Sequence, residues 1–218
     1  MEFIYAKELK KEFSVTGYFY NLVIKNVMFP CRSVLEIKSN SLDNSPNIKP
    51  CAVVVMMNPG SSKPENPDYV PATITVSQIK DSKWDKDLIP ANPDNAQYQI
   101  MRLMKNRNWK YVRVLNLSDL RAGNSREFSN LFNKALKLDS TSPHSLVSTN
   151  RQCELKAHCA GVKNVTAAWG SNYVLKELAE EFLNLFPDIR GLPLDYPWYT
   201  YPSPYKKAQK LEWLKLMG

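Results

Sequence analysis

The sequence predicts an α/β fold, a three-layer α/β/α arrangement around a mainly parallel central sheet. The first observation is a set of three largely apolar runs, at 52–57, 111–115 and 165–168, of which the first is unbroken and typical of a strand buried on both faces. The second is that stretches with helical periodicity, at 95–106, 128–138 and 144–160, lie between or beside these runs. Strands that alternate with helices imply crossover connections, which join parallel strands and place helices on both faces of the sheet.

Length and composition indicate a globular chain rather than a disordered one. The 218 residues are 44% hydrophobic, 11% aromatic and 23% charged. We expect a single domain over 1–218. No apolar run approaches the roughly 18–20 residues that cross a membrane, and the first residues lack a signal-peptide pattern. These features predict a cytoplasmic protein without a membrane partner.

The segments outside the three core strands complete the expected domain. Residues 1–50 are expected to form an N-terminal extension packed on the sheet, with a short helix at 5–13 and strands at 18–25 and 33–38. Residues 61–95 form a long, proline-containing insertion at the mouth of a cleft, where loops of this length are usually functional or flexible. Further helices are predicted at 172–186 and 206–216.

The chain is basic, with a net charge of +8 and a pI of about 9.2. Between positions 101 and 126 there are seven basic residues against one acid. Such a run is typical of a solvated helix face, and beside a base-reading loop it is equally consistent with phosphate contacts.

The first core strand stops abruptly at Asn58-Pro59-Gly60. Proline cannot continue a strand ladder, and glycine permits backbone angles that other residues avoid, so the chain turns sharply there. In open α/β sheets, ligands bind outside the carboxyl ends of the strands. Asn58 is therefore expected at a ligand cleft, although a strand that ends in Asn-Pro-Gly is most often an ordinary turn.

Two later stretches of the sequence bear on the function of this turn. One is Val112-Arg-Val-Leu-Asn116-Leu-Ser-Asp-Leu-Arg-Ala-Gly-Asn124-Ser125, and the other is Val165-Thr-Ala-Ala-Trp169-Gly170-Ser171, followed later by Tyr201-Pro202-Ser203-Pro204-Tyr205. Over residues 50–215, their order and character resemble the uracil-DNA glycosylase superfamily. Its members have a Gly-Ile-Asn-Pro-Gly or Gly-Gln-Asp-Pro-Tyr loop, strands ending in Leu-Asn and Trp-Gly, and a His-Pro-Ser-Pro-Leu loop that enters the DNA minor groove. With asparagine at position 58, the first loop resembles that of the mismatch-specific and thymine-directed branch of the superfamily.

The resemblance implies a monofunctional DNA glycosylase that flips a pyrimidine out of double-stranded DNA and hydrolyses its N-glycosidic bond, leaving an abasic site. The implied catalytic residues are Asn58, which orients the attacking water, and Tyr201, which donates to the departing base. The implied substrate-binding residues are Met57, Pro59, Gly60, Tyr69, Asn116 and Ser118, in which Asn116 reads the base edge and Tyr69 stacks on the base, with Trp84 as a second stacking candidate. The implied DNA-binding residues are Ser61, Ser62, Arg121, Ser171, Ser203, Tyr205, Lys206 and Lys207.

Two departures from the family pattern bear on the substrate. Tyr201 stands where the family has histidine, and Met-Met-Asn replaces Gly-Ile-Asn in the first loop. Together with the 61–95 insertion, they favour a larger base than uracil. We hypothesise a modified cytosine of phage DNA, such as glucosylated hydroxymethylcytosine, which would make the chain an antiviral defence glycosylase, with uracil as the simpler substrate.

Two other functions remain open at this stage. A non-catalytic nucleic-acid-binding protein would keep the fold, and an enzyme acting on free nucleotides would use the same cleft. We expect a monomer with no metal and no cofactor. Four cysteines match the number that holds an iron–sulfur cluster in some superfamily members, but their spacing does not fit, so reduced structural thiols are expected.

Overall fold

The structure is a computed structural model, and it describes residues 2–42, 48–81 and 87–218. The helices are α1 (Ala6–Glu12), α2 (Val76–Lys80), α3 (Asn95–Arg107), α4 (Ser125–Leu138), α5 (Gln152–Cys159), α6 (Lys176–Leu185) and α7 (Lys207–Met217), with short 3₁₀ turns η1 (Thr149–Arg151) and η2 (Tyr173–Leu175). The strands are β1 (Phe13–Ile24), β2 (Val27–Ser39), β3 (Ala52–Met56), β4 (Lys63–Pro64), β5 (Ala72–Thr75), β6 (Ile89–Asn92), β7 (Tyr111–Asn116) and β8 (Val165–Ala167).

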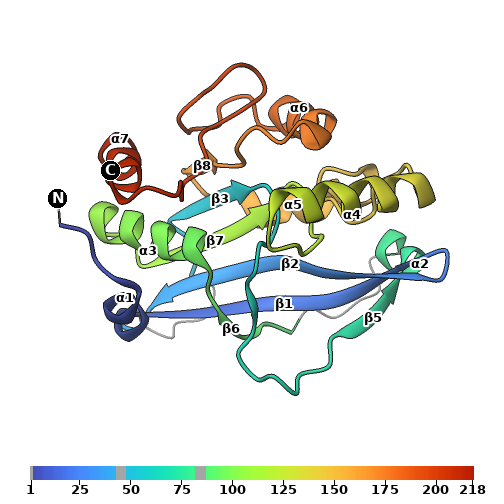
Figure 1. Cartoon of the computed structure of the whole chain (residues 1–218), viewed down its shortest axis with the longest axis horizontal. Helices are drawn as coiled ribbons and strands as arrows, with labels where there is room; N and C mark the ends of the chain where they lie inside the picture. Colours follow the sequence, from blue (N-terminus) through green and yellow to red (C-terminus); the bar gives the residue numbers. More distant parts are fainter. Residues whose placement is uncertain (1, 43–47, 82–86) are drawn as a thin grey trace.

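The protein has a mixed α/β fold around one open sheet with the strand order β4-β6-β1-β2-β7-β3-β8, in which β5 also pairs with β1 (Figure 1). Parallel pairing joins β7, β3 and β8, as predicted, and also β1 and β5. The pairs β1–β2, β2–β7, β1–β6 and β4–β6 are antiparallel. The prediction of a mainly parallel sheet is therefore wrong for the sheet as a whole, because the N-terminal strands join it as a hairpin.

That hairpin consists of β1 and β2, the longest strands of the sheet (Figure 1). Its turn is Lys25-Asn26, and both residues have positive φ, 46° and 66°. Two successive left-handed residues characterise the type I′ turn, whose twist matches that of the paired strands. Both strands lie inside the sheet, so residues 13–39 form part of its centre and not a cover over its edge.

The insertion after β3 also contributes to the sheet. β5 pairs with β1 over Tyr20↔Ala72 to Val23↔Thr75, and β6 pairs with β1 at Gly17↔Ile89. These strands have four residues or fewer and lie among prolines, so they carry too little periodicity to be recognised. The long loop expected over 61–95 is thus partly an edge of the sheet.

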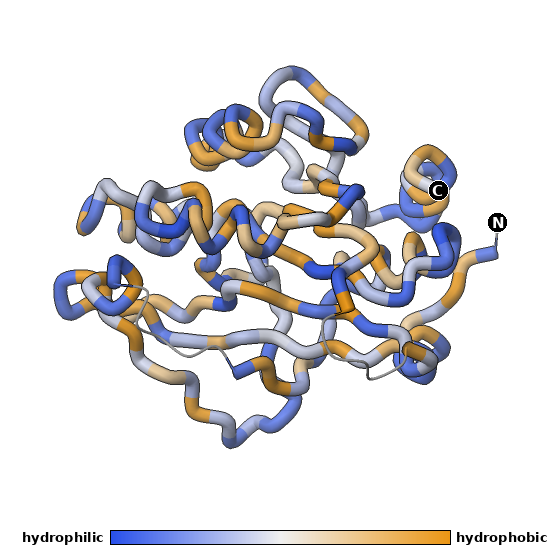
Figure 2. The backbone as a smooth tube through the Cα atoms, turned by 180° about the vertical axis from the view of Figure 1, so that it is seen from behind, coloured by the Kyte–Doolittle hydropathy of each residue, from blue (hydrophilic) through white to orange (hydrophobic). Residues whose placement is uncertain are grey.

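Apolar residues on β3 alternate between two hydrophobic clusters. Val53 and Val55 belong to the cluster that contains the buried residues of α4, α5 and α6. Val54 belongs to the cluster that contains those of α1, α3 and α7. Since successive strand side chains point to opposite faces, helices pack against both faces of β3. Figure 2 shows apolar and hydrophilic residues alternating along the helices, as expected for helices that bury one side.

Most helices match their predicted positions, and one does not. The helix expected over 144–160 is reduced to η1 and α5. Residues 142–148 instead form turns, because the hydroxyl of Ser145 donates to the carbonyl of Leu117 and that of Ser148 donates to the carbonyl of Ser145. Among the described residues, no helix is both long and apolar enough to span a bilayer.

Candidate functional site

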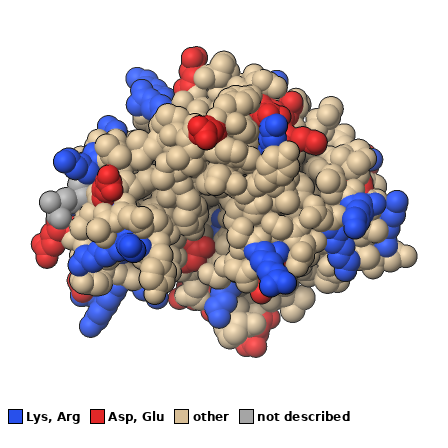
Figure 3. Space-filling view, turned by 45° about the horizontal axis from the view of Figure 1, so that its top comes forward, with Lys and Arg blue, Asp and Glu red and all other residues tan. Residues whose placement is uncertain are grey.

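A cleft of about 480 Å³ opens at the carboxyl ends of β3 and β8. Its wall combines the turn after β3, the first turn of α3, the loop before α4, the segment after β8 and one side chain of the C-terminal loop. The residues that line it are Met56, Met57, Asn58, Gly60, Ser61, Asp94, Asn95, Ala96, Gln97, Ala122, Gly123, Asn124, Ser125, Trp169, Gly170, Ser171, Asn172 and Tyr201. Figure 3 shows a hollow in the middle of one face, with acidic atoms inside it and both basic and acidic side chains on the surface around it.

Asn58 lies in this cleft with only 9% of its surface exposed. Its Nδ2 donates to the carbonyl oxygens of Leu120, at 3.3 Å, and Ala122, at 3.0 Å. These two acceptors fix which way the amide faces. Its Oδ1 has no hydrogen-bond partner among the described residues, so the site presents one fixed acceptor of the kind that orients a water or a donor on a ligand.

Asp94 is the only carboxylate among the described residues that line the cleft, and none of the sequence motifs pointed to it. It caps α3: its Oδ1 accepts from the backbone N–H groups of Ala96, at 2.9 Å, and Gln97, at 3.2 Å, while Gln97 Oε1 accepts from the backbone N–H of Asp94 at 2.8 Å. Burial raises the pKa of Asp94, and the positive charge of Arg32 opposes that shift. The Asp-Asn-Ala-Gln sequence at a helix start is the capping-box signal that marks the position.

Gly60 brings the turn after β3 against this carboxylate. Its φ is +63°, in the left-handed region, and a Cβ at this position would collide with Oδ2 of Asp94. Glycine is therefore needed for both the backbone angle and the close approach. The turn that carries Asn58 and the first turn of α3 consequently form one surface.

Asn116 lies behind the cleft, and it is not among the lining residues. With its amide oriented to satisfy its neighbours, it donates to the backbone carbonyl of Asn58 at 3.0 Å and accepts from Nη2 of Arg32 at 3.3 Å. Arg32 is fully buried and its Nη1 donates to the carbonyl of Pro59 at 3.4 Å. Asn116 and Arg32 therefore support the 58–60 turn from the side away from the cleft. The structure does not place Asn116 where it would read a base edge.

Ser118 is fully buried and does not line the cleft. Its Oγ lies 3.1 Å from Nδ1 of His144 and accepts from the backbone N–H of Leu120. Burial, with a smaller contribution from the charge of Arg151, lowers the pKa of His144 to about 3. This serine–histidine pair, enclosed and neutral, holds the loop that supplies the two acceptors of Asn58.

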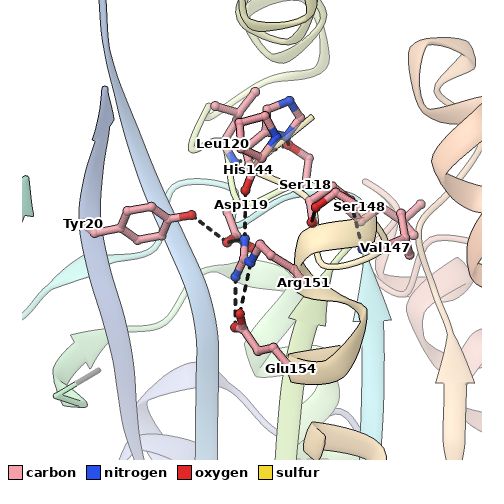
Figure 4. Close-up of polar contacts among 12 residues, drawn as sticks. Tyr20, Ser118, Asp119, Leu120, His144, Val147, Ser148, Arg151 and Glu154 are labelled. Atoms are coloured by element: carbon pink, nitrogen blue, oxygen red, sulfur yellow. Dashed lines mark hydrogen bonds and ion pairs between the residues drawn. The ribbon is translucent and has the colours of Figure 1, made fainter. Parts of the chain in front are cut away.

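The same loop is anchored by a buried ionic network (Figure 4). Asp119 Oδ2 accepts from Nη1 of Arg151 at 2.6 Å and from the hydroxyl of Tyr20 at 2.8 Å, and Arg151 also pairs with Glu154 at 2.9 Å. Because these groups come from β1, η1 and α5, the network fixes the segment after β7 against three other elements. Sequence periodicity gave no sign of it.

Tyr201 also lines the cleft, with 39% of its surface exposed. Burial of the hydroxyl and the negative charge of Asp94 raise its pKa to about 12. The backbone N–H of Gly170 donates to the carbonyl of Tyr199 at 2.8 Å, which fastens the C-terminal loop to the segment after β8. Nε1 of the buried Trp169 adds a hydrogen bond to the carbonyl of Pro197 at 3.1 Å. The structure thus brings Tyr201 and Asn58, the two predicted catalytic residues, to one cleft.

The predicted substrate-binding residues divide between the cleft and its surroundings. Met57 and Gly60 line it, while Pro59 only supplies its carbonyl to Arg32. Tyr69 is half-buried, packs against the cluster that contains α3 and α7, and does not line the cleft. Trp84 lies outside the described residues. Tyr69 is therefore not in position to act as the stacking aromatic that the resemblance implies.

The predicted DNA-binding residues also divide. Ser61 and Ser171 line the cleft, whereas Ser62 is buried and its carbonyl accepts from Nη2 of Arg121 at 2.8 Å. The hydroxyl of Ser203 is shielded from solvent and has no hydrogen-bond partner among the described residues.

Beyond Ser203, the C-terminal loop reaches the surface. Tyr205 is 98% exposed, and Lys206 beside it is exposed as well. Lys207 donates to the hydroxyl of Tyr5 at 3.2 Å. An exposed aromatic and two lysines thus follow the cleft residue Tyr201.

Within the described ranges, no group of three or more His, Cys, Asp or Glu side chains is arranged to hold a metal ion. All four cysteines are free thiols, of which Cys31 and Cys159 are buried and Cys153 is exposed. Burial raises the pKa of Cys159 to about 11, so that thiol stays protonated near neutral pH.

No protein-family model, curated protein or solved structure matches this chain.

Proposed function

We propose that this protein is a DNA glycosylase that hydrolyses the N-glycosidic bond of a pyrimidine extruded from double-stranded DNA. The observation that carries the proposal is the shared cleft of Asn58 and Tyr201 at the carboxyl ends of β3 and β8. In such a cleft an acceptor is needed to orient water, and a donor is needed for the charge that develops on the departing base. Asn58 Oδ1 is the acceptor and the Tyr201 hydroxyl is the donor.

The two residues suit these roles for different reasons. Asn58 is held by Leu120 and Ala122, so its free Oδ1 is already oriented before a ligand arrives. Tyr201 has a pKa of about 12, so its hydroxyl is protonated throughout the neutral range and acts as a hydrogen-bond donor. Neither residue forms a covalent bond with the sugar in this scheme, and the products are an abasic site and a free base.

The proposal includes an architecture and a DNA-binding surface. The architecture is the three-layer form of the uracil-DNA glycosylase superfamily, supported by the parallel strands β7-β3-β8 and by helices on both faces of β3. The surface is the loop after Tyr201, where the exposed ring of Tyr205 fills the space of the extruded base and Lys206 binds a flanking phosphate. A modified cytosine remains the proposed substrate, and antiviral defence the proposed role.

A second candidate is hydrolysis of a free nucleoside. The described residues that line the cleft include no lysine and no arginine. A free nucleotide would need a cation for its phosphates, so this wall favours an uncharged glycoside over a free nucleotide. Free nucleosides therefore belong in the same assay.

The test is an excision assay on duplex oligonucleotides that carry uracil, a thymine mismatch, hydroxymethylcytosine or glucosylated hydroxymethylcytosine, followed by alkali. We expect strand cleavage at one of these bases. Asn58→Ala should still bind the same duplex but excise about 100-fold to 1,000-fold more slowly. Asn95→Ala, which removes another amide from the cleft wall, is the matched control. If the wild-type protein releases no base from the whole panel, the glycosylase assignment is overturned.

A further inference from the structure

We infer that Asp94 is a catalytic residue, the group that accepts a proton from the attacking water; this inference rests on the glycosylase function proposed above. Hydrolysis requires such an acceptor, and an amide is too weak a base to be one. Of the described residues that line the cleft, Asp94 supplies the only carboxylate. Tyr201, the other titratable side chain there, is a protonated donor near neutral pH.

The position of the carboxylate is fixed by the helix that it caps. The two backbone N–H groups of Ala96 and Gln97 hold Oδ1, and the side chain of Gln97 holds the backbone of Asp94 in return. Oδ2 points the other way, against Gly60, two residues after Asn58. Asn58 and Asp94 both line the cleft, so a water that donates to Asn58 Oδ1 lies in the same cleft as this carboxylate, to which the backbone N–H of Ser61 also donates.

The electrostatic surroundings make Asp94 a stronger base than an exposed aspartate. Burial raises the pKa of Asp94, and a carboxylate with a raised pKa removes protons more effectively. The charged and titratable groups that face it are Arg32 from β2 and Tyr201 from the C-terminal loop. The positive charge of Arg32 and the N-terminus of α3 both stabilise the ionised carboxylate of Asp94, which is the form that can accept a proton.

The reaction balances without any other reactant. The water oxygen forms a bond to the anomeric carbon of the sugar while the bond from that carbon to the base nitrogen breaks. The electron pair of the broken bond leaves with the base, whose negative charge accepts a hydrogen bond from Tyr201. The proton lost by water goes to Asp94 and then to the departing base, which restores the carboxylate.

The competing explanation is that Asp94 only caps α3, and Asp94→Asn separates the two roles. Asparagine caps helices as well as aspartate, so the variant should melt within about 1 °C of wild type, whereas Asp94→Ala should melt about 2–4 °C lower. We expect Asp94→Asn to excise between about 100-fold and 10,000-fold more slowly. Asp68→Asn, which neutralises an exposed acid of the insertion, is the charge control and should excise at the wild-type rate.

The pH dependence supplies a second readout that a capping role would not change. In wild type, kcat/KM should fall as acidification protonates Asp94, and the residual activity of Asp94→Asn should lack this fall. Excision by Asp94→Asn within threefold of wild type, or an unchanged acid limb, overturns the assignment of Asp94 while the glycosylase function stands. A wild-type protein that excises nothing overturns both.

Discussion

At the scale of single residues, the hydroxyl of Tyr201 is the most direct test of how the leaving base is stabilised. Its pKa of about 12 keeps it protonated, so in the proposed reaction it contributes one hydrogen bond to the developing negative charge. We expect Tyr201→Phe to slow excision about 100-fold in single-turnover assays and to change duplex affinity little. Tyr196→Phe, another exposed tyrosine of the C-terminal region, is the control. Equal rates for Tyr201→Phe and wild type would remove the hydroxyl from the chemistry.

Two glycines of the cleft wall make a matched pair for a stability measurement. Gly60 has a φ of +63° and touches Asp94, whereas a Cβ on Gly123 would meet no atom within 4 Å. We expect Gly60→Ala to lower the free energy of unfolding by about 1–3 kcal/mol, because alanine is strained in this backbone region. Gly123→Ala should change it by less than about 0.5 kcal/mol. Urea unfolding measures both, and similar values for the two variants would contradict the role given to Gly60.

His144 should make the fold sensitive to acid. Its pKa falls from 6.5 to about 3 on folding, so between these values the unfolded chain binds a proton that the folded protein excludes. The stabilising contribution of His144 is therefore present above pH 6.5 and is lost as the pH falls toward 3. As the pH falls through this window, the free energy of unfolding of wild type should decrease by up to about 1.4 kcal/mol per pH unit more than that of His144→Asn.

Urea unfolding at pH 6.5, 5.5 and 4.5 measures that slope. His158→Asn, at the other histidine of the chain, controls for the loss of an imidazole as such. Parallel pH dependence of His144→Asn and wild type would show that burial does not perturb this imidazole.

The residues of the site differ in how far the sequence could reveal them. Asn58 and Tyr201 were predicted because each stands in a short motif at the end of a predicted strand or in a proline-stiffened loop. Asp94 was missed because its capping box is a signal of helix starts in general, and only the fold places this one beside Asn58. Asn116 was given a ligand role, but its partners, Arg32 and the backbone of Asn58, come from elements far along the chain.

At the scale of elements, the turn of the β1–β2 hairpin can be replaced by a sequence that makes the protein more stable. Lys25 and Asn26 both adopt positive φ, which costs a lysine about 1–2 kcal/mol. Replacing the pair by Asn-Gly, the preferred type I′ sequence, should raise the free energy of unfolding by about 0.5–1 kcal/mol. Replacing it by Ala-Ala should lower it. Thermal unfolding of both variants checks the assignment, and a loss of stability with Asn-Gly would contradict it.

The elements also show where sequence periodicity succeeds and where it stops. α3, α4 and α7 and the strands β3 and β7 were predicted within a few residues. α3 and α4 each begin at a side-chain cap, and β3 and β7 are largely apolar. The place of residues 13–39 in the sheet was not predictable. Two adjacent strands joined by two residues must pair antiparallel, but the pattern does not say that β2 then pairs with β7.

At the scale of the whole molecule, the net charge of +8 should make the proposed DNA binding depend strongly on salt. If Lys206 and Lys207 each bind one phosphate, replacing both by alanine should reduce the slope of log affinity against log salt by about two. Lys134→Ala with Lys137→Ala, on α4, removes the same charge elsewhere. Fluorescence anisotropy at salt concentrations from about 50 to about 200 mM measures the slopes. Equal slopes for the two double variants would contradict phosphate contacts by the C-terminal loop.

The cleft is assembled from stretches that lie far apart in the chain: 56–61, 94–97, 122–125, 169–172 and position 201. No fragment shorter than about two thirds of the protein contains all of them, so the groups of the proposed site meet only after the strands β3, β7 and β8 have paired. During refolding from urea, recovery of helical circular dichroism should therefore precede recovery of base release. The proposed base release would thus report on the last step of folding, the assembly of the cleft.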